Sequence, residues 1–284
     1  MIFARAFTQG NTTDFANWHA RSGDNGAGII TPTQNMVNAY EMKATGERPY
    51  TEEADGTLVL NAGSGYDPQK PFEGRDPRFY ASVLYDGAVW MDRETETFFG
   101  GKDDANDPAA AQPWNATHTG YYLRKFMDEK VPPSGSSVKM TSPWIHFRYA
   151  EILLNYAEAK FEAGEEGTAR IYLNKVRQRT GVKMPDINDT GDVLRERIQN
   201  ERRVELAFEH HRFFDVRRWK IAETTEKIPL QKMVITKENS VKKYDIQTLY
   251  NRDFKSHQYL MPIPRTEIEK SMNTLTQNDG YATK

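Results

Sequence analysis

Cysteine is missing from this chain of 284 residues. Its absence excludes disulfide bonds, thiolate metal sites and thiol catalysis, and it fits either a reducing compartment or an exported protein that avoids thiols. Long hydrophobic runs are missing too: mean hydropathy is −0.77, and no apolar stretch approaches the roughly 18 residues that a membrane helix needs. The opening sequence MIFARAFTQG has one Arg and a very short apolar stretch, which predicts no signal peptide within this sequence.

An excess of one charge is also lacking. The chain has 38 Lys and Arg against 40 Asp and Glu, a net charge of −2. This balance provides no field that would gather nucleic acid or an anionic membrane, so binding of polyanions is not expected as the main function. The length fits one large domain or two ordinary ones.

Aromatic side chains are abundant, although hydrophobic residues as a class are few. The sequence has 14 Tyr, 14 Phe and 5 Trp, so that 12% of residues are aromatic and only 38% are hydrophobic. Large rigid rings with a polar group fill cores, and they also hold ligands by stacking at a low entropic cost. Composition leaves both uses open.

The chain changes character near its middle. Residues 1–140 hold most of the Gly and Pro, in turn clusters such as residues 61–68, and predict a loop-rich, ligand-facing region with short elements. A helix is expected from Pro32 with Thr31 as its N-cap. Residues 78–87 partly alternate and end in Asp-Gly, which predicts a strand.

Residues 141–284 predict a helical scaffold followed by a C-terminal extended segment. Apolar stripes at helical spacing predict helices over residues 145–163, 168–180 and 192–210, and the first two form a hairpin. The sequence past these helices is charged and irregular until Met-Pro-Ile-Pro at residues 261–264, which favours extended backbone.

The hairpin carries a spacing typical of tetratricopeptide helix pairs. Ala157 and Phe161 match the pattern small-x-x-x-aromatic, in which the small residue lets the partner helix approach closely. The predicted fold is therefore mainly α, with a tetratricopeptide-like helical hairpin scaffold, a large irregular loop-rich region and a few short strands.

Signatures of common catalytic sites are absent. The sequence has no P-loop, no dinucleotide-binding glycine motif, no Gly-x-Ser-x-Gly and no His-Glu-x-x-His. Adjacent histidines at 210–211 point about 100° apart on a helix and make no chelating pair. The pairs Asp103/Asp104 and Glu52/Glu53 lie in polar, turn-rich runs, and we interpret them as solvated surface rather than glycosidase acids. We expect no catalytic residue, no metal ligand and no cofactor.

Residues 201–219 hold the densest mixture of charges and rings. Glu201, Glu205 and Glu209 follow i, i+4 spacing, so they form one row on a helix where arginines from neighbouring turns can pair with them bidentately. We interpret the run as structural, with partly buried Arg–carboxylate bonds and Arg–aromatic packing that tie a helix end to the next turn. A pocket for a ligand carboxylate or phosphate is the alternative.

Aromatic residues outside the helical stripes are the candidates for ligand binding. Flat rings in polar loops bind the CH-rich faces of sugars while neighbouring polar groups satisfy the hydroxyls. The alternative is that each ring pins its own loop to the body of the protein. The candidates, with one neighbouring histidine, are Trp18, His19, Tyr50, Tyr66, Trp90 and Trp114.

Short motifs follow one another along nearly the whole chain. PTQ-x-x-V-x-x-Y-x-M begins at Pro32, RDPRF at Arg75 and GYY-x-x-K at Gly120. The later motifs are RYAE-x-LL-x-YAE (148–158), LN-x-VR-x-R-x-G (173–181), ERR-x-ELAFE (201–209), DVRRW (215–219), H-x-YL-x-PIP (257–264) and QN-x-GY (277–281). In content and order they resemble the SusD/RagB family, the outer-membrane nutrient-binding lipoproteins of Bacteroidetes.

The resemblance implies a non-catalytic protein on the external face of the cell outer membrane. Such a protein binds an oligosaccharide, or a peptide in the RagB branch, and delivers it to a SusC-like TonB-dependent transporter during nutrient uptake and polysaccharide utilisation. The helices would form the scaffold and the irregular half would carry the ligand contacts. Membrane contact would be through a lipid anchor alone, and neither anchor nor signal lies in this sequence.

Two features depart from the family pattern. His210 stands where the family often has Gly as a helix stop, so we expect the helix to end one residue differently or His210 to adopt a less comfortable backbone. Family members are about twice this length, and their first half carries the lipoprotein signal, the lipidated Cys and most of the scaffold. We therefore expect a C-terminal portion, from truncation or an incomplete gene model, with part of the hairpin's apolar face exposed.

Three functions stay open at this point. The first is glycan binding by the candidate rings, with hydrogen bonds from neighbours such as His19, Arg21, Asn25 or Asp67. The second is a protein-interaction scaffold whose groove takes a peptide or partner. The third and most remote is a glycoside hydrolase, which needs two carboxylates about 5–10 Å apart in a cleft.

Overall fold

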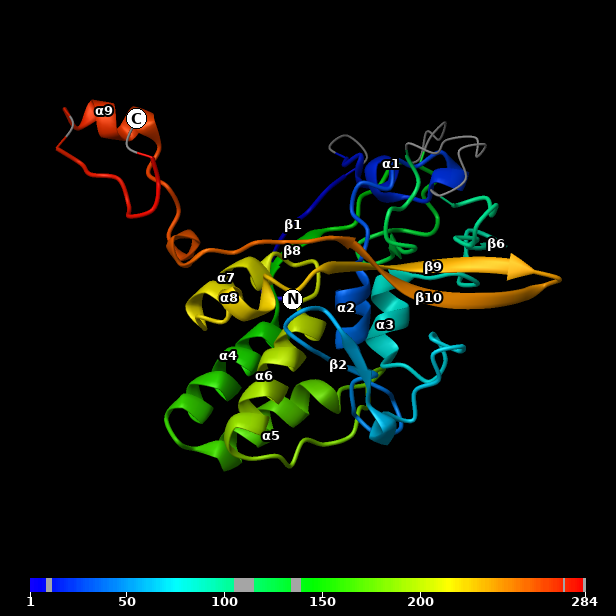
Figure 1. Ribbon diagram of the computed structural model, residues 1–284, viewed down its shortest axis with the longest axis horizontal. Helices are drawn as coiled ribbons and strands as arrows, with labels where there is room; N and C mark the ends of the chain where they lie inside the picture. The colour runs from blue at the N-terminus through cyan, green and yellow to red at the C-terminus, as the bar shows by residue number, and fades with distance from the viewer. Residues whose placement is uncertain (9–11, 105–114, 134–138, 273, 283–284) are drawn as a thin grey trace.

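The computed structural model describes residues 1–8, 12–104, 115–133, 139–272 and 274–282. Figure 1 shows a helical group of α4, α5 and α6, a long hairpin of β9 and β10, and a loop-rich region beyond the hairpin. The α-helices are α1 (Phe15–His19), α2 (Gln34–Ala39), α3 (Pro77–Ser82), α4 (Tyr149–Glu162), α5 (Glu166–Arg177), α6 (Gly191–Glu205), α7 (His211–Arg218), α8 (Ala222–Thr225) and α9 (Arg265–Lys270).

The strands of the described residues pair two by two, and every pair is antiparallel. The longest pair is β9 with β10, and the others have two to four residues per strand. The pairs are β1 (Phe3–Arg5) with β8 (Trp144–Phe147), β2 (Tyr50–Glu52) with β3 (Leu58–Leu60), β4 (Val83–Leu84) with β7 (Tyr122–Leu123), β5 (Val89–Trp90) with β6 (Arg93–Glu94), and β9 (Leu230–Glu238) with β10 (Val241–Tyr250). The predicted mainly helical, tetratricopeptide-like fold with short strands is confirmed.

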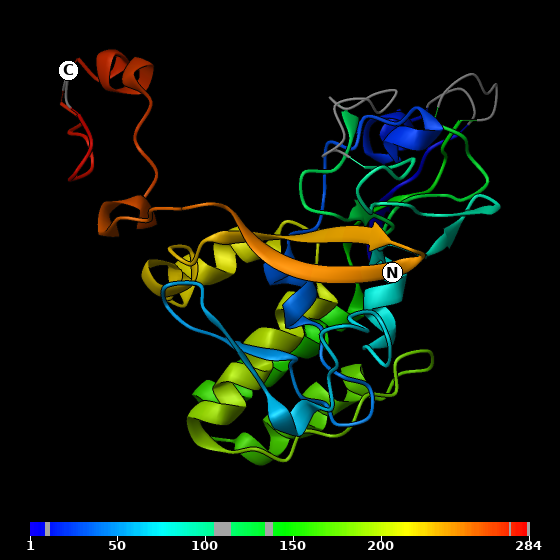
Figure 2. The same cartoon turned by 45° about the vertical axis from the view of Figure 1, so that its right-hand side comes forward.

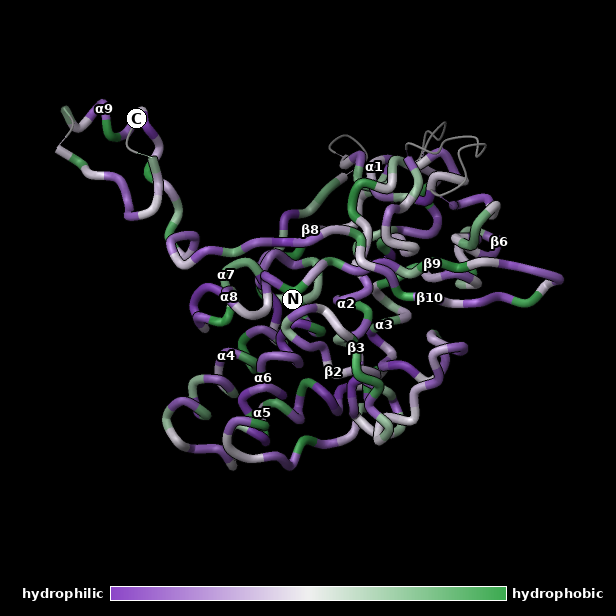
Figure 3. Tube along the Cα trace, viewed as in Figure 1, coloured by the Kyte–Doolittle hydropathy of each residue, from purple (hydrophilic) through white to green (hydrophobic). Residues whose placement is uncertain are grey.

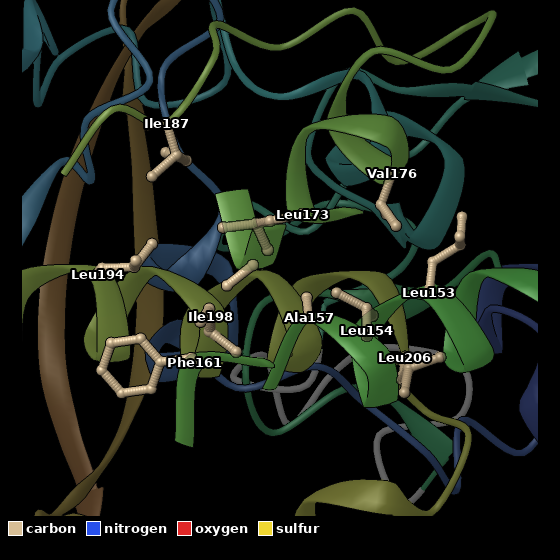
Figure 4. Close-up of a cluster of buried hydrophobic side chains, with 11 residues drawn as sticks. Leu153, Leu154, Ala157, Phe161, Leu173, Val176, Ile187, Leu194, Ile198 and Leu206 are labelled. Atoms are coloured by element: carbon tan, nitrogen blue, oxygen red, sulfur yellow. The ribbon is translucent and has the colours of Figure 1, made fainter. Parts of the chain in front are cut away.

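The predicted helix hairpin forms the first hydrophobic core. Ala157 is fully buried, and Leu154 and Leu173 pack beside it between α4, α5 and α6 (Figure 4). The small side chain at 157 allows the close approach that the spacing predicted. Gly164 and Gly181 follow the two helices with φ of +79° and +88°, a left-handed backbone that glycine adopts without strain.

The outer face of the hairpin is exposed, as expected. Tyr149, Ile152 and Tyr156 lie at i, i+3 and i+7 on α4 and are 62%, 45% and 41% exposed, and Ile171 of α5 is 57% exposed. The apolar spacing that predicted this helix ran through Tyr149, Tyr156 and Phe161 and so mixed two faces of α4, because the buried side is formed by Leu153, Leu154, Ala157 and Phe161.

Several predicted element boundaries are wrong for local reasons. Helix α2 begins at Gln34 rather than Pro32, because the chain stays extended through Thr33, whose side chain accepts a bond from the Met36 amide at 3.3 Å. The first half of the predicted strand at 78–87 is helix α3, which Asp76 caps, and only Val83–Leu84 form a strand, β4.

Helix α4 begins at Tyr149 rather than Ile145, because residues 144–147 pair with β1 as strand β8. Helix α6 ends at Glu205 rather than at residue 210. The chain then turns, and His210 has φ of +65°, so its expected uncomfortable backbone is confirmed.

The β9–β10 hairpin was missed, because its strands carry many charges and the segment looked irregular. Its inner side chains alternate: Met233 and Ile235 are buried against α2 and α3 in a second core with Tyr40, Phe79 and Tyr121. This core joins the loop-rich region to the helices through the long hairpin (Figure 2).

A buried network of arginines and carboxylates also joins the two regions. Arg78 of α3 pairs with Glu201 and Glu205 of α6, and the Arg78–Glu205 pair is 3.0 Å long. Arg177 of α5 bonds to both Glu201 and Glu41 at 2.8 Å. The structural interpretation of this acidic row is thus confirmed, but the partners come from across the fold rather than from neighbouring turns.

Glu205 is the most heavily paired of these carboxylates. Burial opposes its charge, but Arg148, Arg78 and Arg179 around it lower its pKa from 4.5 to about 2. Glu209 continues the row and bonds to Arg148 and Lys125. Removing one partner from such a buried set leaves charges without compensation, so the network holds the regions together only when complete.

We predict that Glu205→Gln lowers the free energy of unfolding at pH 7 by about 3–5 kcal/mol, since it leaves buried guanidinium groups unpaired. Because the folded-state pKa lies below the unfolded one, the carboxylate stabilises the fold above about pH 4.5 and loses this effect as the pH falls towards 2. Urea unfolding across this range should therefore show a flatter pH dependence in the variant.

Glu238→Gln is the matched control, because Glu238 is exposed and its ion pair with Lys243 is 3.6 Å long. A change within about 0.5 kcal/mol is expected there. Equal effects of the two substitutions would contradict a structural role for Glu205.

Candidate functional site

Two of the predicted rings meet in one groove. Tyr50 lies on β2, and Tyr66 follows the β2–β3 hairpin; their ring centroids are 5.2 Å apart in an edge-to-face arrangement. Both rings line a groove of about 410 Å³ between the β2–β3 hairpin and the β9–β10 hairpin. We call it the tyrosine groove, and its other lining residues are Gly56, Thr57, Leu58, Pro68, Gln231, Met233, Tyr244, Asp245, Ile246 and Thr248.

A third ring on the opposite wall completes the groove. Tyr244 of β10 is half-buried and packs edge-on against Phe72, with centroids 5.6 Å apart. The amide side chain of Gln69 meets the backbone of Tyr244 through two bonds of 3.4 Å, which hold the loop against the strand. Tyrosines from three separate segments therefore border one opening.

The floor of the groove holds a polar group without a partner. The side-chain oxygen of Gln231 is buried and accepts no hydrogen bond from the described residues. Its amide nitrogen is fixed by donation to the Gly56 carbonyl at 2.7 Å, so the free oxygen has a set direction. An unpaired buried acceptor is costly, and a ligand hydroxyl or a water would satisfy it.

The charge state of the groove is simple. Burial raises the pKa of Tyr50, Tyr66 and Tyr244, so their hydroxyls stay neutral at physiological pH and can both donate and accept. Asp245 is exposed at the rim. The guanidinium of Arg75 lies 5.3 Å from the Tyr66 ring centroid and is held by three backbone carbonyls, which fixes the ring from behind.

Asn35 of α2 fixes both walls of the groove. Its side-chain oxygen accepts a hydrogen bond from the backbone N–H of Gln231 at 2.9 Å. Its side-chain nitrogen donates to the Pro229 carbonyl at 3.1 Å and to the carboxylate of Glu52. One buried amide therefore connects the helix, the start of β9 and the end of β2.

Trp90 does not lie at the groove. Its ring is 3% exposed and packs with Leu84 and Tyr122, while the guanidinium of Arg124 lies 5.4 Å from its centroid. The ring fills a core, which favours the alternative that it pins its own loop.

Trp18 and His19 lie on α1, which Figures 1 and 2 place well away from β2. Trp18 is 50% exposed, whereas the His19 ring is half-buried against Phe15 with centroids 4.1 Å apart. Burial lowers the pKa of His19, so it is neutral at pH 7. Trp114 falls outside the described residues. Of the candidates that the structure describes, Tyr50 and Tyr66 are the two that share the groove.

Two other interpretations of polar residues need correction. Asp103 is fully buried rather than solvated, and it binds the guanidinium of Arg93 at 2.7 Å and the amides of Gly23 and Glu96. Arg21, expected as a possible ligand contact, is also buried and bonds to loop backbone and side chains. Both residues have a structural role, because they hold irregular backbone whose polar groups are not satisfied by the hydrogen bonds of a helix or sheet.

Sequence reasoning missed Tyr244, Gln231 and Asp245. Each lies on the β9–β10 hairpin, which was not predicted. The short apolar run at residues 233–235, rich in β-branched side chains and followed by a turn at Asn239, was the signal that could have found it.

Among the described residues, no group of three His, Asp or Glu side chains is placed to hold a metal ion. No helix in the described part of the chain is long and apolar enough to cross a membrane.

The structure combines a mainly helical scaffold with a groove bordered by three tyrosines. Comparison with known proteins specifies the class. The model of the SusD family matches residues 1–281, so the chain belongs to the SusD family.

Individual relatives agree with this assignment. SusD-like protein P2 of Formosa agariphila is 30% identical over 149 residues, which cover 49% of this chain and 26% of that protein. A SusD-like protein from Bacteroides fragilis is 31% identical with a TM-score of 0.77, and the match covers 99% of this chain and 54% of the other.

A second structure from B. fragilis is described as a SusD-like carbohydrate binding protein. It is 26% identical with a TM-score of 0.71, and the match covers 94% of this chain and 53% of that chain. The chain thus spans about half the length of these structural relatives.

We predict that Trp90→Ala destabilises the protein by about 3–5 kcal/mol, as expected for removal of a large core ring. Trp18→Ala should change the free energy of unfolding by less than about 1 kcal/mol, because the ring is half exposed. Thermal and urea unfolding of both variants provide the measurement. A stable Trp90→Ala variant that loses ligand binding would instead make Trp90 a ligand contact.

Proposed function

We propose that this chain is a non-catalytic glycan-binding module and that the tyrosine groove holds the sugar. The observation that carries the proposal is the convergence of Tyr50, Tyr66 and Tyr244 on one groove whose floor has an unpaired, fixed amide oxygen at Gln231. Family membership supports carbohydrate as the ligand class, since a SusD-like relative is described as carbohydrate binding.

The chemistry of the groove suits a neutral sugar. The half-buried rings of Tyr50 and Tyr244 would pack on the CH groups of a pyranose, and their neutral hydroxyls would exchange hydrogen bonds with sugar hydroxyls, while the buried ring of Tyr66 supports Tyr50 edge-on. The Gln231 oxygen would accept from one hydroxyl, while Thr57, Thr248 and Asp245 offer further partners at the rim. A volume of about 410 Å³ suits one to two sugar rings, with the remainder of an oligosaccharide outside.

The biological setting of the proposal follows the family. Binding at the external face of the outer membrane would present an oligosaccharide to a SusC-like TonB-dependent transporter. Family membership supports this setting. No residue in the groove is assigned to catalysis.

We predict that Tyr244→Ala and Gln231→Met each weaken binding of the cognate oligosaccharide by about tenfold or more, through loss of ring contact and of a hydrogen-bond acceptor respectively. A glycan array identifies the ligand, and titration calorimetry then measures each variant. Binding should be insensitive to salt, because no charged pair carries it.

Tyr250→Ala is the control, since Tyr250 lies on the same strand, is 57% exposed and does not line the groove. Its affinity should equal that of the unmodified chain. Release of reducing sugar would replace the proposal with a glycoside hydrolase. Binding of peptides and not of glycans would favour a RagB-like function.

A further inference from the structure

A second aromatic pocket lies in the loop-rich region, between the β1–β8 ladder and the start of α1. It has a volume of about 330 Å³. We call it the Trp144 pocket, and four rings line it, with two polar side chains beside them: Phe7, Phe15, Phe126, Trp144, Arg5 and His146. Figure 1 shows β1 beside β8 and leading to α1. The pocket shares no described residue with the tyrosine groove.

The β1–β8 ladder builds one wall of this pocket. Arg5 is the partner of Trp144 across the antiparallel ladder. Side chains that stand directly opposite each other in such a ladder lie on the same face of the sheet, with their Cβ atoms about 5 Å apart. Phe7 and His146 follow these two residues at i+2, the spacing that returns a side chain to the same face. Two short strands therefore gather a guanidinium, an indole, a phenyl ring and an imidazole on one wall.

Two phenylalanine rings enclose Trp144 from other segments. The centroid of the Trp144 ring lies 5.0 Å from that of Phe126 and 6.1 Å from that of Phe15. The two phenylalanine rings meet edge-on, with their centroids 6.2 Å apart. All three residues are half-buried, unlike Trp90, whose ring fills a core. Part of each ring therefore stays accessible to a ligand in the pocket.

The backbone at Phe126 is held in a strained conformation. Its φ of +69° lies in the left-handed region, which aromatic residues rarely adopt. The preceding residue, Lys125, is anchored in the helical region through the carboxylate of Glu209 and the Ala207 carbonyl, the latter at 2.8 Å. Strain of this kind clusters at binding sites, where the surrounding structure maintains it.

The charge of the pocket is opposite in sign to that of the tyrosine groove. The guanidinium of Arg5 is exposed, lies 5.0 Å from the Phe7 ring centroid, and forms no ion pair with a described carboxylate. Among the described residues that line the pocket, none is Asp or Glu. The tyrosine groove has Asp245 at its rim and no Lys or Arg among its described lining residues. The two sites therefore favour different ligands.

Periodicity in the sequence does not reveal this pocket. Trp144 directly precedes the helix predicted at residues 145–163, and Phe15 and Phe126 reach it from distant parts of the chain. Hydrophobic and hydrophilic residues follow one another closely around β8 and α1 (Figure 3). Only the folded chain brings the rings and the cation together.

The groups in the pocket fit a sugar ring that carries a carboxylate. The accessible ring faces would pack on the CH groups of a pyranose. The planar guanidinium of Arg5 would bind a carboxylate through two parallel N–H groups, which a neutral hydroxymethyl group cannot match. Ser142 and His146 in the lining offer hydrogen bonds to hydroxyls. The volume suits one sugar ring.

We propose that the Trp144 pocket is a second carbohydrate site, separate from the tyrosine groove, and that it takes a uronic acid residue with its carboxylate on Arg5 and its ring against Trp144. A neighbouring hollow of about 390 Å³ shares Phe126 and Ser142 with the pocket, which leaves room for the next rings of an oligosaccharide.

The neighbouring hollow does not itself select an acid. Its charged lining residues are Arg124, Lys125, Asp128 and Glu129, two of each sign. Selection for the carboxylate is therefore assigned to Arg5 in the Trp144 pocket.

The test uses the full 284-residue chain and pairs of probes that differ in charge. The probes are oligomers of galacturonic, glucuronic, mannuronic and guluronic acid, each beside its methyl ester, which keeps the stereochemistry and removes the negative charge. We expect titration calorimetry to detect binding of one or more of the acids, with the matching ester about tenfold weaker or worse. The affinity should fall as salt is raised, because a charge pair carries the contact.

Arg5→Gln and Trp144→Ala should each weaken binding of that acid by about tenfold or more. Arg5→Lys should recover part of the affinity, because an ammonium keeps the charge but lacks the planar pair of donors. Arg5 is exposed, so Arg5→Gln should stay folded by circular dichroism, and it decides the outcome if Trp144→Ala unfolds. Arg265→Gln is the matched control, because Arg265 is exposed on α9 and lines neither the pocket nor the hollow. Its affinity should be unchanged.

Tyr244→Ala separates the two sites, because Tyr244 lines the tyrosine groove and not the Trp144 pocket. It should leave binding of the acid unchanged, so failure of this inference and failure of the proposed function give different results. The inference is overturned if none of the acids binds, if the methyl ester binds equally well, or if Arg5→Gln has no effect. Binding of sulfated neutral oligosaccharides in preference to the uronic acids would also overturn it.

Discussion

The buried contact between Arg78 and the carboxylates of Glu201 and Glu205 is the constraint on which the remaining architecture depends. The guanidinium of Arg78, a residue of α3 in the loop-rich region, meets two acids on α6 in the helical region. Arg177 extends the network to Glu41, which follows α2. Buried charges of this kind are tolerated only with complete partners, so the two regions must fold against each other for either set to be satisfied.

The same network explains how a groove with irregular walls acquires a fixed shape. Asn200 of α6 donates to the Ala39 carbonyl at 3.1 Å, and α2 in turn places Asn35 between β2 and β9. The helical core therefore fixes the position of α2, and α2 in turn fixes the two walls of the tyrosine groove. A site built on loops needs such support, because loops have few backbone bonds of their own.

Local rules predicted the helical scaffold well. The small residue at Ala157 and the stops at Gly164 and Gly181 act within a few residues of chain and have the predicted effect, whereas the apolar spacing located the helices but mixed two faces of α4. His210 also behaved as expected, because a backbone with positive φ is required there whatever the residue. The division of the chain near residue 140 stays a prediction, although buried ion pairs and a shared core cross it.

The groove could not be predicted in the same way. Tyr50 and Tyr66 were found because they stand in polar surroundings, but so does Trp90, which is core. Tyr244 lies about 180 residues further along the chain, and only tertiary packing of β10 against Gln69 brings it to the groove. The reason for glycine at position 120 is also visible only in the folded protein. The motif around Gly120 was evident in the sequence, but a Cβ added there would lie 2.4 Å from the carbonyl oxygen of Met233 on β9.

The most direct test of the account is whether the two regions unfold together. The chain lacks cysteine, so Lys70→Cys and Lys175→Cys, both at exposed positions, each introduce a single thiol. A thiol-reactive fluorescent label can then be attached in either region without side reactions. We predict one urea midpoint and one slope for both labels, with Arg78→Met shifting both midpoints equally. Two separated midpoints, or a shift confined to one label, would contradict the claim that the buried network makes the regions one cooperative unit.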